Sequence, residues 1–236
     1  AGFCFWGTTI LNIWFSFAGV LLYCLVMKKK PGAMANAFLF STGLAPLITE
    51  MLFRYPGEAW HGFTGLGIVL ALAVGIFIGF IFPAVLPHSP QMHKGYDLYN
   101  AAVPIGLIAF FLRSLLYKIF TSAPPASENV GLADSFLPLS IGFCLVVFLL
   151  AIIWGLALGG GKEYGRLLRD SGYNVDYGTK YGSGAAILNF GVYGLFIVLY
   201  YLLIGAKWNA ATLGCVFCMV CCCYKGSHPA NVWPIM

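Results

Sequence analysis

The sequence predicts an all-α polytopic membrane protein, and three observations support this fold class. Hydrophobic residues make up 60% of the 236 residues and charged residues only 9%, and the mean hydropathy is +0.86. A soluble domain carries about 25% charged residues, so this chain has too few to cover a surface that faces water. The apolar residues also gather in runs close to the length of about 20 residues that a membrane-spanning helix needs.

Seven apolar runs are candidates for transmembrane or re-entrant helices. They are Thr9–Met27, Ala33–Phe53, Gly62–Leu86, Leu98–Phe120, Phe136–Leu158, Ala185–Ile204 and Ala210–Tyr224. The last run has 15 residues, which is short enough for a re-entrant segment. An open sheet is excluded because lipid offers no partners for its edges, and the alternating pattern of a membrane barrel is missing.

Short polar segments separate these runs, and their charges predict an orientation. If Lys28–Lys30 face the cytoplasm, strict alternation places nine basic residues inside and three outside, with Arg113 inside a span. This bias fits the positive-inside rule and predicts a multi-pass protein of the cell inner membrane. The net charge of +5 therefore does not indicate nucleic-acid binding, because the basic residues form no continuous face.

The two ends of the chain resemble each other. Cys4–Trp14 aligns without gaps to Cys223–Trp233, with Cys, Gly, Asn and Trp identical at a constant offset of 219 residues (226 − 7). We interpret residues 1–236 as a single transmembrane domain that holds one permuted repeat of about 219 residues and the start of a second copy, cut at both ends. Seven crossings between equivalent points would make the repeats inverted, whereas a re-entrant seventh segment would make them parallel.

A second, weaker sequence similarity lies within the proposed repeat of about 219 residues. Gly95–Asn100 and Gly184–Asn189 share the pattern Gly-x-x-(Leu/Ile)-x-Asn at the entrance of a span. The longer segments around them, His93–Asn100 and Gly184–Gly191, together with Gly43–Glu50 and Lys225–Asn231, resemble an uncharacterised family of bacterial multi-pass membrane proteins, known only as a domain of unknown function. The resemblance covers nearly the whole chain and implies that members carry the motifs twice. It implies no substrate.

Ionisable residues within apolar spans indicate function because each costs about 2.5–3.5 kcal/mol or more at the bilayer centre. Glu50 lies near the outer end of the second span and Arg113 in the outer half of the fourth. Their similar depth predicts an ion pair, either structural or linked to ion coupling. The alternative is that Arg113 extends its charge to the interface.

The Gly95–Asn100 segment combines residue types that disfavour a regular helix. A broken helix here would leave free N–H groups facing a cavity, with Tyr96, Asp97 and Asn100 lining a polar path and Asp97 offering a charge or a proton site. The competing interpretation is that Asp97 or Asn100 is only an N-cap.

Other polar residues near the ends of the spans extend this hypothesis. Asn189, Asn231 and Asn12 are candidate path residues, although a buried Asn also joins helices without any other role. His228 follows a predicted turn and is a candidate proton carrier, or else an interfacial residue.

The cysteines and Gly-rich segments do not predict a cofactor. Five cysteines lie between Cys215 and Cys223, in a spacing that resembles part of an iron–sulfur motif but that also suits close helix packing. We expect packing, and neither a metal nor a cofactor. Nucleotide-binding and hydrolase motifs are missing, so we expect no enzyme activity.

The sequence therefore predicts a membrane transporter or channel for a small solute or ion, with a polar path formed by broken helices. Its expected partners are the lipid bilayer and the solute, without nucleic acid, and a homo-oligomer is compatible with the sequence. An intramembrane enzyme acting on a hydrophobic or lipid-linked substrate is one alternative. A membrane subunit that does not transport is another.

Overall fold

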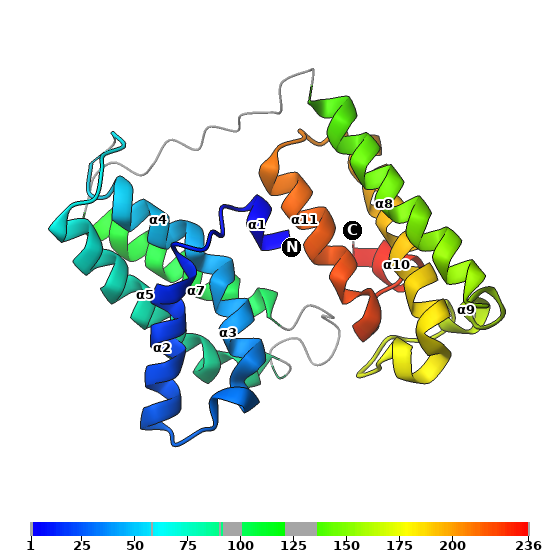
Figure 1. Cartoon of the computed structure of the whole chain (residues 1–236), viewed down its shortest axis with the longest axis horizontal. Coiled ribbons are helices and arrows are strands. Elements are labelled where there is room, and N and C mark those ends of the chain that lie inside the picture. The colour runs from blue at the N-terminus through cyan, green and yellow to red at the C-terminus, as the bar shows by residue number, and fades with distance from the viewer. Residues whose placement is uncertain (1, 58, 90, 92–100, 121–135, 236) are drawn as a thin grey trace. The chain divides into compact units, whose positions relative to one another are not determined.

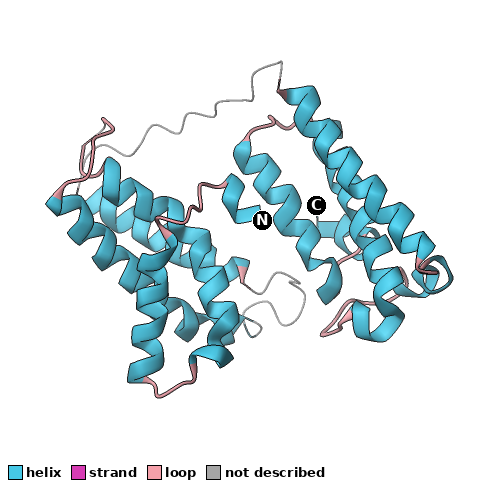
Figure 2. Cartoon of the chain, in the orientation of Figure 1, coloured by secondary structure: helices cyan, strands magenta, loops and turns pink. Residues whose placement is uncertain are grey.

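The computed structural model describes residues 2–57, 59–89, 91, 101–120 and 136–235, and its regular elements in these ranges are all helices (Figures 1 and 2). They belong to two compact units. The N-terminal unit contains the described part of residues 6–120, and the C-terminal unit contains residues 2–5 and 136–235. The expectation of one domain over 1–236, built on a repeat, stays a prediction.

The N-terminal unit is built from four apolar helical segments. They are α2 (Ile13–Val26); η1 (Pro31–Met34) with α3 (Ala35–Ser41), η2 (Thr42–Leu44) and α4 (Ala45–Phe53); α5 (Gly65–Val85) with η3 (Leu86–His88); and α7 (Ala102–Ser114) with the π-helical η4 (Leu115–Ile119). The second segment changes from α3 to α4 through η2, just before Pro46. Proline has no N–H to continue the ladder, which favours a break at this point.

Close packing between α2 and α5 holds the N-terminal unit together. Gly19 and Gly79 face each other, and a Cβ atom on Gly79 would overlap the carbonyl oxygen of Ser16. Small residues at a helix crossing let the two backbones approach, which is how helices associate in lipid. Around this contact lies an apolar core that includes Val20, Ile78 and, from α4, Ile48.

The C-terminal unit pairs two long helices with several shorter ones. Its elements are α1 (Gly2–Phe5), α8 (Leu137–Ala157), α9 (Gly161–Leu167), α10 (Tyr177–Leu203), α11 (Ala210–Cys221), η5 (Cys222–Lys225), α12 (Pro229–Val232) and η6 (Trp233–Ile235). Glycines again mediate the crossing: Gly155 of α8 packs on Leu188 of α10, and Gly194 of α10 packs on Phe148 of α8. A larger side chain at either glycine would separate α8 from α10.

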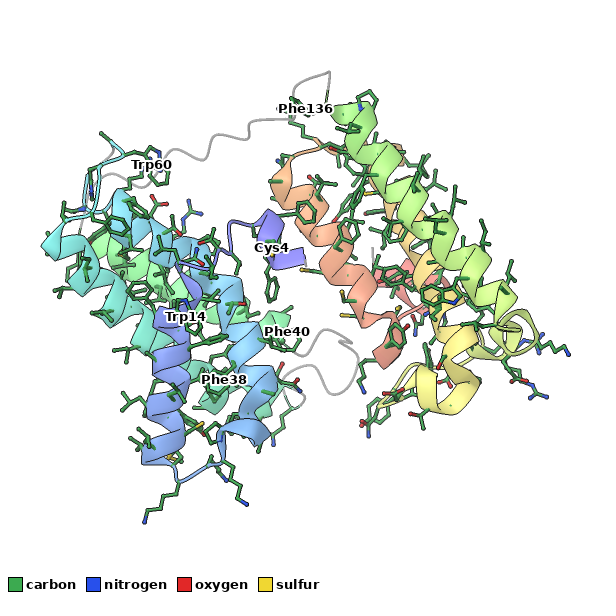
Figure 3. The ribbon with its side chains drawn as sticks, viewed as in Figure 1. Cys4, Trp14, Phe38, Phe40, Trp60 and Phe136 are labelled. Carbon is green, nitrogen blue, oxygen red and sulfur yellow. The ribbon has the colours of Figure 1, made fainter. Side chains whose placement is uncertain are left out.

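One face of α8 is left uncovered by its own unit. Leu139, Phe143, Val146, Leu150 and Trp154 are exposed there, at helical spacing. Apolar area of this size costs free energy in water, so the face requires an apolar environment. Aromatic residues at element ends and in a loop, such as Trp14, Trp60 and Phe136, are also exposed (Figure 3), as expected of side chains at a membrane interface.

The structure confirms the predicted fold class. Five of the helical segments are long and apolar enough to cross a membrane, and two shorter apolar helices, Ile13–Val26 and Ala210–Lys225, complete the set of seven. The protein is thus an all-α, multi-pass membrane protein. Only the described residues support this statement, since Leu98–Asn100 at the start of the fourth predicted run lie outside them.

Two helix boundaries differ from the prediction. Helix α10 begins at Tyr177 rather than Ala185, and the polar stretch Gly159–Ser183 contains α9 as well as the first turns of α10. Helix α2 begins at Ile13 rather than Thr9 because residues before it form a turn. At both boundaries a polar side chain accepts a hydrogen bond from a main-chain N–H group, Asn12 from Thr9 and Asp176 from Thr179. A hydropathy pattern does not reveal such hydrogen bonds.

Candidate functional site

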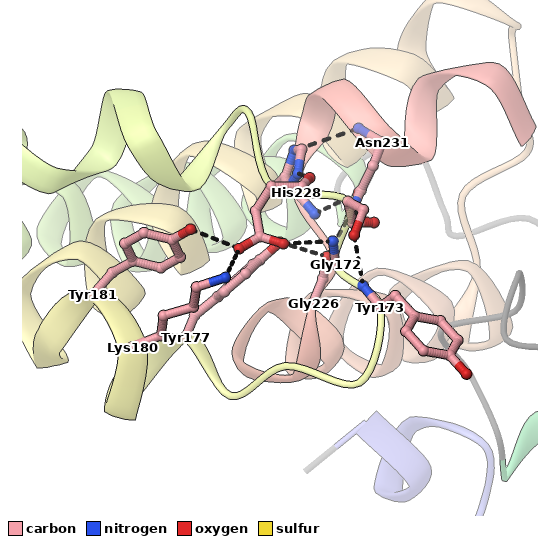
Figure 4. A network of polar contacts seen from close by, with 10 residues as sticks. Gly172, Tyr173, Tyr177, Lys180, Tyr181, Gly226, His228 and Asn231 are labelled. Atoms are coloured by element: carbon pink, nitrogen blue, oxygen red, sulfur yellow. Dashed lines mark hydrogen bonds and ion pairs between the residues drawn. The ribbon is translucent and has the colours of Figure 1, made fainter.

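A buried turn follows α11 and η5 in the C-terminal unit. Gly226 has φ +117°, a conformation that favours glycine, and its carbonyl accepts hydrogen bonds from Tyr177 Oη at 2.8 Å and Asn231 Nδ2 at 2.7 Å. Gly172 packs so closely on Gly226 that a Cβ atom on either would overlap the backbone of the other. The turn is thus fixed by side chains and backbone from three segments of this unit (Figure 4).

His228 closes the turn as the N-cap of α12. Asn231 Oδ1 accepts a hydrogen bond from the His228 main-chain N–H at 2.9 Å, and His228 Nδ1 accepts one from the Asn231 N–H at 3.3 Å. Since Nδ1 is an acceptor, the ring proton lies on Nε2, which donates to the Asp170 carbonyl oxygen at 2.9 Å. Both ring nitrogens of His228 are therefore engaged by the main chain.

The protonation state of His228 follows from its surroundings. Burial lowers the pKa of His228 below its ordinary value, and the contact with Asp170 opposes this shift only in part. The side chain is 1% exposed. His228 is thus neutral at physiological pH, and these contacts favour a structural role over the proton carrier that the sequence suggested.

Asp170 is the ionic centre of the same cluster. Its Oδ2 atom accepts from Lys180 Nζ and from Tyr181 Oη, both at 2.6 Å, and its Oδ1 atom accepts from the Gly172 N–H at 3.0 Å (Figure 4). Burial disfavours the Asp170 carboxylate, but these hydrogen bonds outweigh it and lower the pKa of Asp170 to about 2. The carboxylate stays ionised and fully occupied by partners.

Asn189 lies deeper in the unit, beyond a break in α10. The break is at Gly182, whose φ of +84° and ψ of 159° interrupt the helix. Asn189 is fully buried, and its Nδ2 atom donates to the carbonyl oxygens of Cys223 at 3.1 Å and Ser227 at 2.8 Å. Asn189 therefore ties α10 to the end of η5 and to the turn at Gly226.

Three buried oxygen atoms near this point have no hydrogen-bond partner among the described residues. They are Asn189 Oδ1, Ser227 Oγ and Tyr164 Oη. Tyr164 packs on a small cluster that includes Ala185 and Ala186, one turn before Asn189. We call Tyr164, Asp170, Tyr177, Asn189, Ser227, His228 and Asn231 the Asn189 cluster. An unpartnered buried polar atom costs about 1–3 kcal/mol, so the three atoms call for an explanation.

The N-terminal unit contains a second turn with the same hydrogen bonds. Gly7 has φ +93°, its carbonyl accepts from Asn12 Nδ2 at 2.8 Å, and Asn12 Oδ1 accepts from the Thr9 N–H at 2.8 Å. Gly7, Thr9 and Asn12 lie 219 residues before their counterparts Gly226, His228 and Asn231. This turn is more exposed than the other, since Gly7 and Thr9 are both exposed.

Asn12 has one further contact that its counterpart lacks. Its Nδ2 atom also donates to Thr49 Oγ1 of α4 at 2.8 Å, and the Asn12 side chain is buried. The Asn12 amide thus holds its turn and joins it to α4, whereas Asn231 Nδ2 joins its turn to the loop after α9 by donating to the Ser171 carbonyl oxygen at 3.3 Å. These contacts fit the alternative that the sequence left open, in which the asparagines only join segments.

The ion pair expected between Glu50 and Arg113 is not the one that the structure contains. Glu50 Oε1 pairs with Arg54 at 3.2 Å, one helical turn along the same segment. Arg113 is exposed on α7. A pair at this spacing needs no tertiary contact, whereas similar depth in two different spans does not ensure that two side chains meet.

The remaining predicted residues lie outside the described part of the chain. Tyr96, Asp97 and Asn100 belong to the range 92–100, which the structure does not describe, so their role in a polar path stays a prediction. Among the described residues, no group of three or more His, Cys, Asp or Glu side chains could hold a metal ion.

Sequence reasoning missed several members of the Asn189 cluster. Asp170, Tyr177 and Tyr164 fall in the stretch taken for a polar loop. The signal that could have placed Tyr177 on a helix is Asp176-x-x-Thr179, an N-cap pattern in which Asp176 Oδ1 accepts from the Thr179 N–H at 3.0 Å. That pattern marks the start of α10 eight residues before the predicted start.

Comparison with known proteins gives a family but no activity. No curated protein and no solved structure matches the chain. A family model described as "Protein of unknown function (DUF1576)" matches residues 1–118 and 161–236. These ranges contain both turns and all members of the Asn189 cluster. The chain therefore belongs to the DUF1576 family of proteins of unknown function.

Proposed function

We propose that this protein is a membrane transporter or channel for a small solute or ion, and that the Asn189 cluster lies on its polar path. One observation supports this most: in a membrane protein, buried oxygen atoms without partners lie where a helix broken at Gly182 contacts a buried turn. Transporters place solutes at such breaks, because helix ends and polar side chains can replace the water that a solute loses.

The electrostatics of the cluster narrow the kind of solute. The two lysines near it are neutralised, Lys180 by Asp170 and Lys225 by Asp176, and His228 is neutral. The unpartnered atoms are an amide oxygen and two hydroxyl groups. The amide oxygen can only accept, whereas the hydroxyl groups can donate or accept. Because both lysines are paired, the set suits a neutral polar molecule or a small cation better than an anion, which binds most strongly to positive charge.

Flux into proteoliposomes tests this function. The protein would be reconstituted and offered a panel of small neutral and cationic solutes, and Asn189→Leu would be compared with Asn209→Leu. Asn209 caps α11 through the Thr212 N–H, so its loss costs stability away from the cluster. We expect flux that Asn189→Leu abolishes and Asn209→Leu retains. Equal flux in both variants would remove the cluster from the path.

A non-transporting membrane subunit is the second candidate. The full engagement of Asn12 and Asn231 in hydrogen bonds favours it, because that reading requires asparagines that only join helices. It predicts no flux for any solute. An intramembrane enzyme has less support, since both ring nitrogens of His228 are held by the main chain.

A further inference from the structure

Asn189 and Ser227 are in direct contact, and each has one buried oxygen atom without a hydrogen-bond partner among the described residues, Asn189 Oδ1 and Ser227 Oγ. Asn189 Nδ2 lies 2.8 Å from the Ser227 carbonyl oxygen, and Oδ1 is bonded to the same carbon as Nδ2. Both residues are fully buried. The amide hydrogens are used by two carbonyl groups, so the amide oxygen can only receive a positive charge or a donated hydrogen.

The surroundings of this pair are rich in oxygen. The carbonyl groups of Cys223 and Ser227 lie beside it, and the end of η5 at Lys225 presents the negative end of the α11–η5 segment. Tyr164 Oη, on α9, adds a third buried oxygen atom and a second hydroxyl group. The charged groups near the pair are already matched, since Lys180 and Lys225 are bound by carboxylates.

We propose that Asn189 Oδ1 and Ser227 Oγ bind a monovalent alkali cation, with Na⁺ as the first choice. Amide, hydroxyl and carbonyl oxygens are the ligands of hard cations, and in transporters the carbonyls at broken helices coordinate Na⁺. A divalent ion does not fit, because it needs carboxylates and the carboxylate of Asp170 is fully occupied. Binding of the cation satisfies both orphaned atoms.

A role for this cation in coupling rests on the proposed function, whereas its binding does not. If transport fails and Na⁺ still binds, the site is a structural cation site. If flux is found and depends on Asn189 but Na⁺ does not bind, the proposed function stands and the cation site is wrong. The two failures are therefore distinguishable.

The first measurement is the thermal unfolding midpoint of the purified full chain in detergent, with choline chloride replaced stepwise by NaCl at constant ionic strength. A ligand that binds the folded state raises the midpoint in a saturable way. We expect a rise with Na⁺ of several degrees and none with choline. Identical midpoints in both salts, with no radioactive sodium retained by the protein, would overturn the site and leave a buried water as its occupant.

Ser227→Ala locates the site. Because Ser227 Oγ has no partner among the described residues, this variant keeps the hydrogen bonds at the Ser227 backbone and is expected to fold as the wild type does in choline. We expect it to lose most of the Na⁺-dependent shift. A shift of wild-type size in Ser227→Ala would place the cation elsewhere and refute the proposal.

Ser16→Ala is the matched control. Ser16 is also fully buried, but it lies in the N-terminal unit and donates to the Ile13 carbonyl at 3.0 Å. This variant is expected to lower the midpoint equally in both salts and to keep the Na⁺ shift. Loss of the shift in Ser16→Ala as well would show that the response to salt is global, and would count against the site.

Discussion

At the scale of single residues, the two asparagines of the turns, Asn12 and Asn231, each make several hydrogen bonds that hold their turn in place. The Asn231 side chain makes hydrogen bonds to His228, Gly226 and Ser171. Asn231→Ala removes these bonds while leaving the partners buried, so we expect the free energy of unfolding to fall by about 1–3 kcal/mol. Thermal unfolding in detergent measures this, with the exposed neighbour Ala230→Ser as a neutral control.

His228 makes stability depend on pH. Its pKa is lowered by burial in the folded protein, so the unfolded chain binds a proton more readily than the folded one. The stability that neutral His228 provides is complete above the unfolded pKa of about 6.5 and is lost as pH falls below it. We expect the unfolding midpoint to drop between about pH 6.5 and 5.

His228→Asn isolates this effect. Asparagine is a good N-cap and does not titrate, so the variant is expected to keep the cap of α12 and to lose most of the decline in that pH window. A decline of wild-type size in His228→Asn would assign the pH dependence to another group. Asp170 acts only at lower pH, because its pKa of about 2 keeps it ionised throughout this window.

At the scale of elements, the break in α10 depends on one glycine. Gly182 has φ +84° and ψ 159°, which only glycine adopts readily, and open space surrounds it. Gly182→Ala is expected to destabilise the protein by about 1–3 kcal/mol through backbone strain alone.

Gly106→Ala is the control for that substitution. Gly106 lies inside α7, also in open space, but with an ordinary helical backbone. The same change there is expected to stabilise by about 0.5–1 kcal/mol, since alanine favours the helix. Opposite signs of the two midpoint shifts are the expected result, and a stabilising Gly182→Ala would contradict the strained geometry.

The elements also show how far the sequence alone could lead. All seven apolar runs correspond to helices, because burial in lipid requires apolar length and that length is visible in the sequence. The start of α10 was missed because its first residues are not an apolar run, and hydropathy does not register a cap. The local pattern Asp176-x-x-Thr179, in which the Asp176 side chain caps the helix, marks this start in the sequence.

The site was less predictable than the fold for the same reason. Asn189, Asn231 and Asn12 were found because polar residues beside apolar runs stand out. Asp170, Tyr164 and Tyr177 were not, because in the sequence they look like an ordinary loop. The sequence did not reveal the partner of Glu50, which pairs with Arg54, because depth in two spans does not specify which faces meet.

At the scale of the whole molecule, the two turns make the repeat testable. Each turn has the same two side-chain hydrogen bonds among a glycine, an asparagine and a residue between them, and the two sets of residues are 219 positions apart. This likeness supports the interpretation of an internal repeat. If seven segments cross the membrane between them, the turns lie on opposite sides. In a chain without native cysteines, Thr9→Cys and Ala230→Cys, both at exposed positions, are then expected to react with an impermeant maleimide from opposite faces.

Labelling of intact cells reports which of the two cysteines faces the outside, and labelling of inverted vesicles reports which faces the cytoplasm. Labelling of both positions from one face would indicate parallel repeats with a re-entrant seventh segment. Lys28→Cys serves as the reference, since the charge bias predicts that it faces the cytoplasm. If the Lys28→Cys variant were labelled from outside the cell, the predicted orientation of every span would be reversed. The comparison between the two turns would not change.

The ion pairs of the C-terminal unit have a consequence for how the folded protein meets charged lipids. Five of the six basic residues of this unit, all except Lys207, lie on the side that the charge bias predicts to be cytoplasmic. Of these five, Arg166, Lys180 and Lys225 have a carboxylate within ion-pair distance, whereas Lys162 and Arg169 have none among the ion pairs of the described residues. If the positive-inside bias orients the chain, the unfolded segment would present all five charges to anionic headgroups. After folding, we expect the attraction to come mainly from Lys162 and Arg169, so the segment would hold anionic lipids less strongly than it did during insertion.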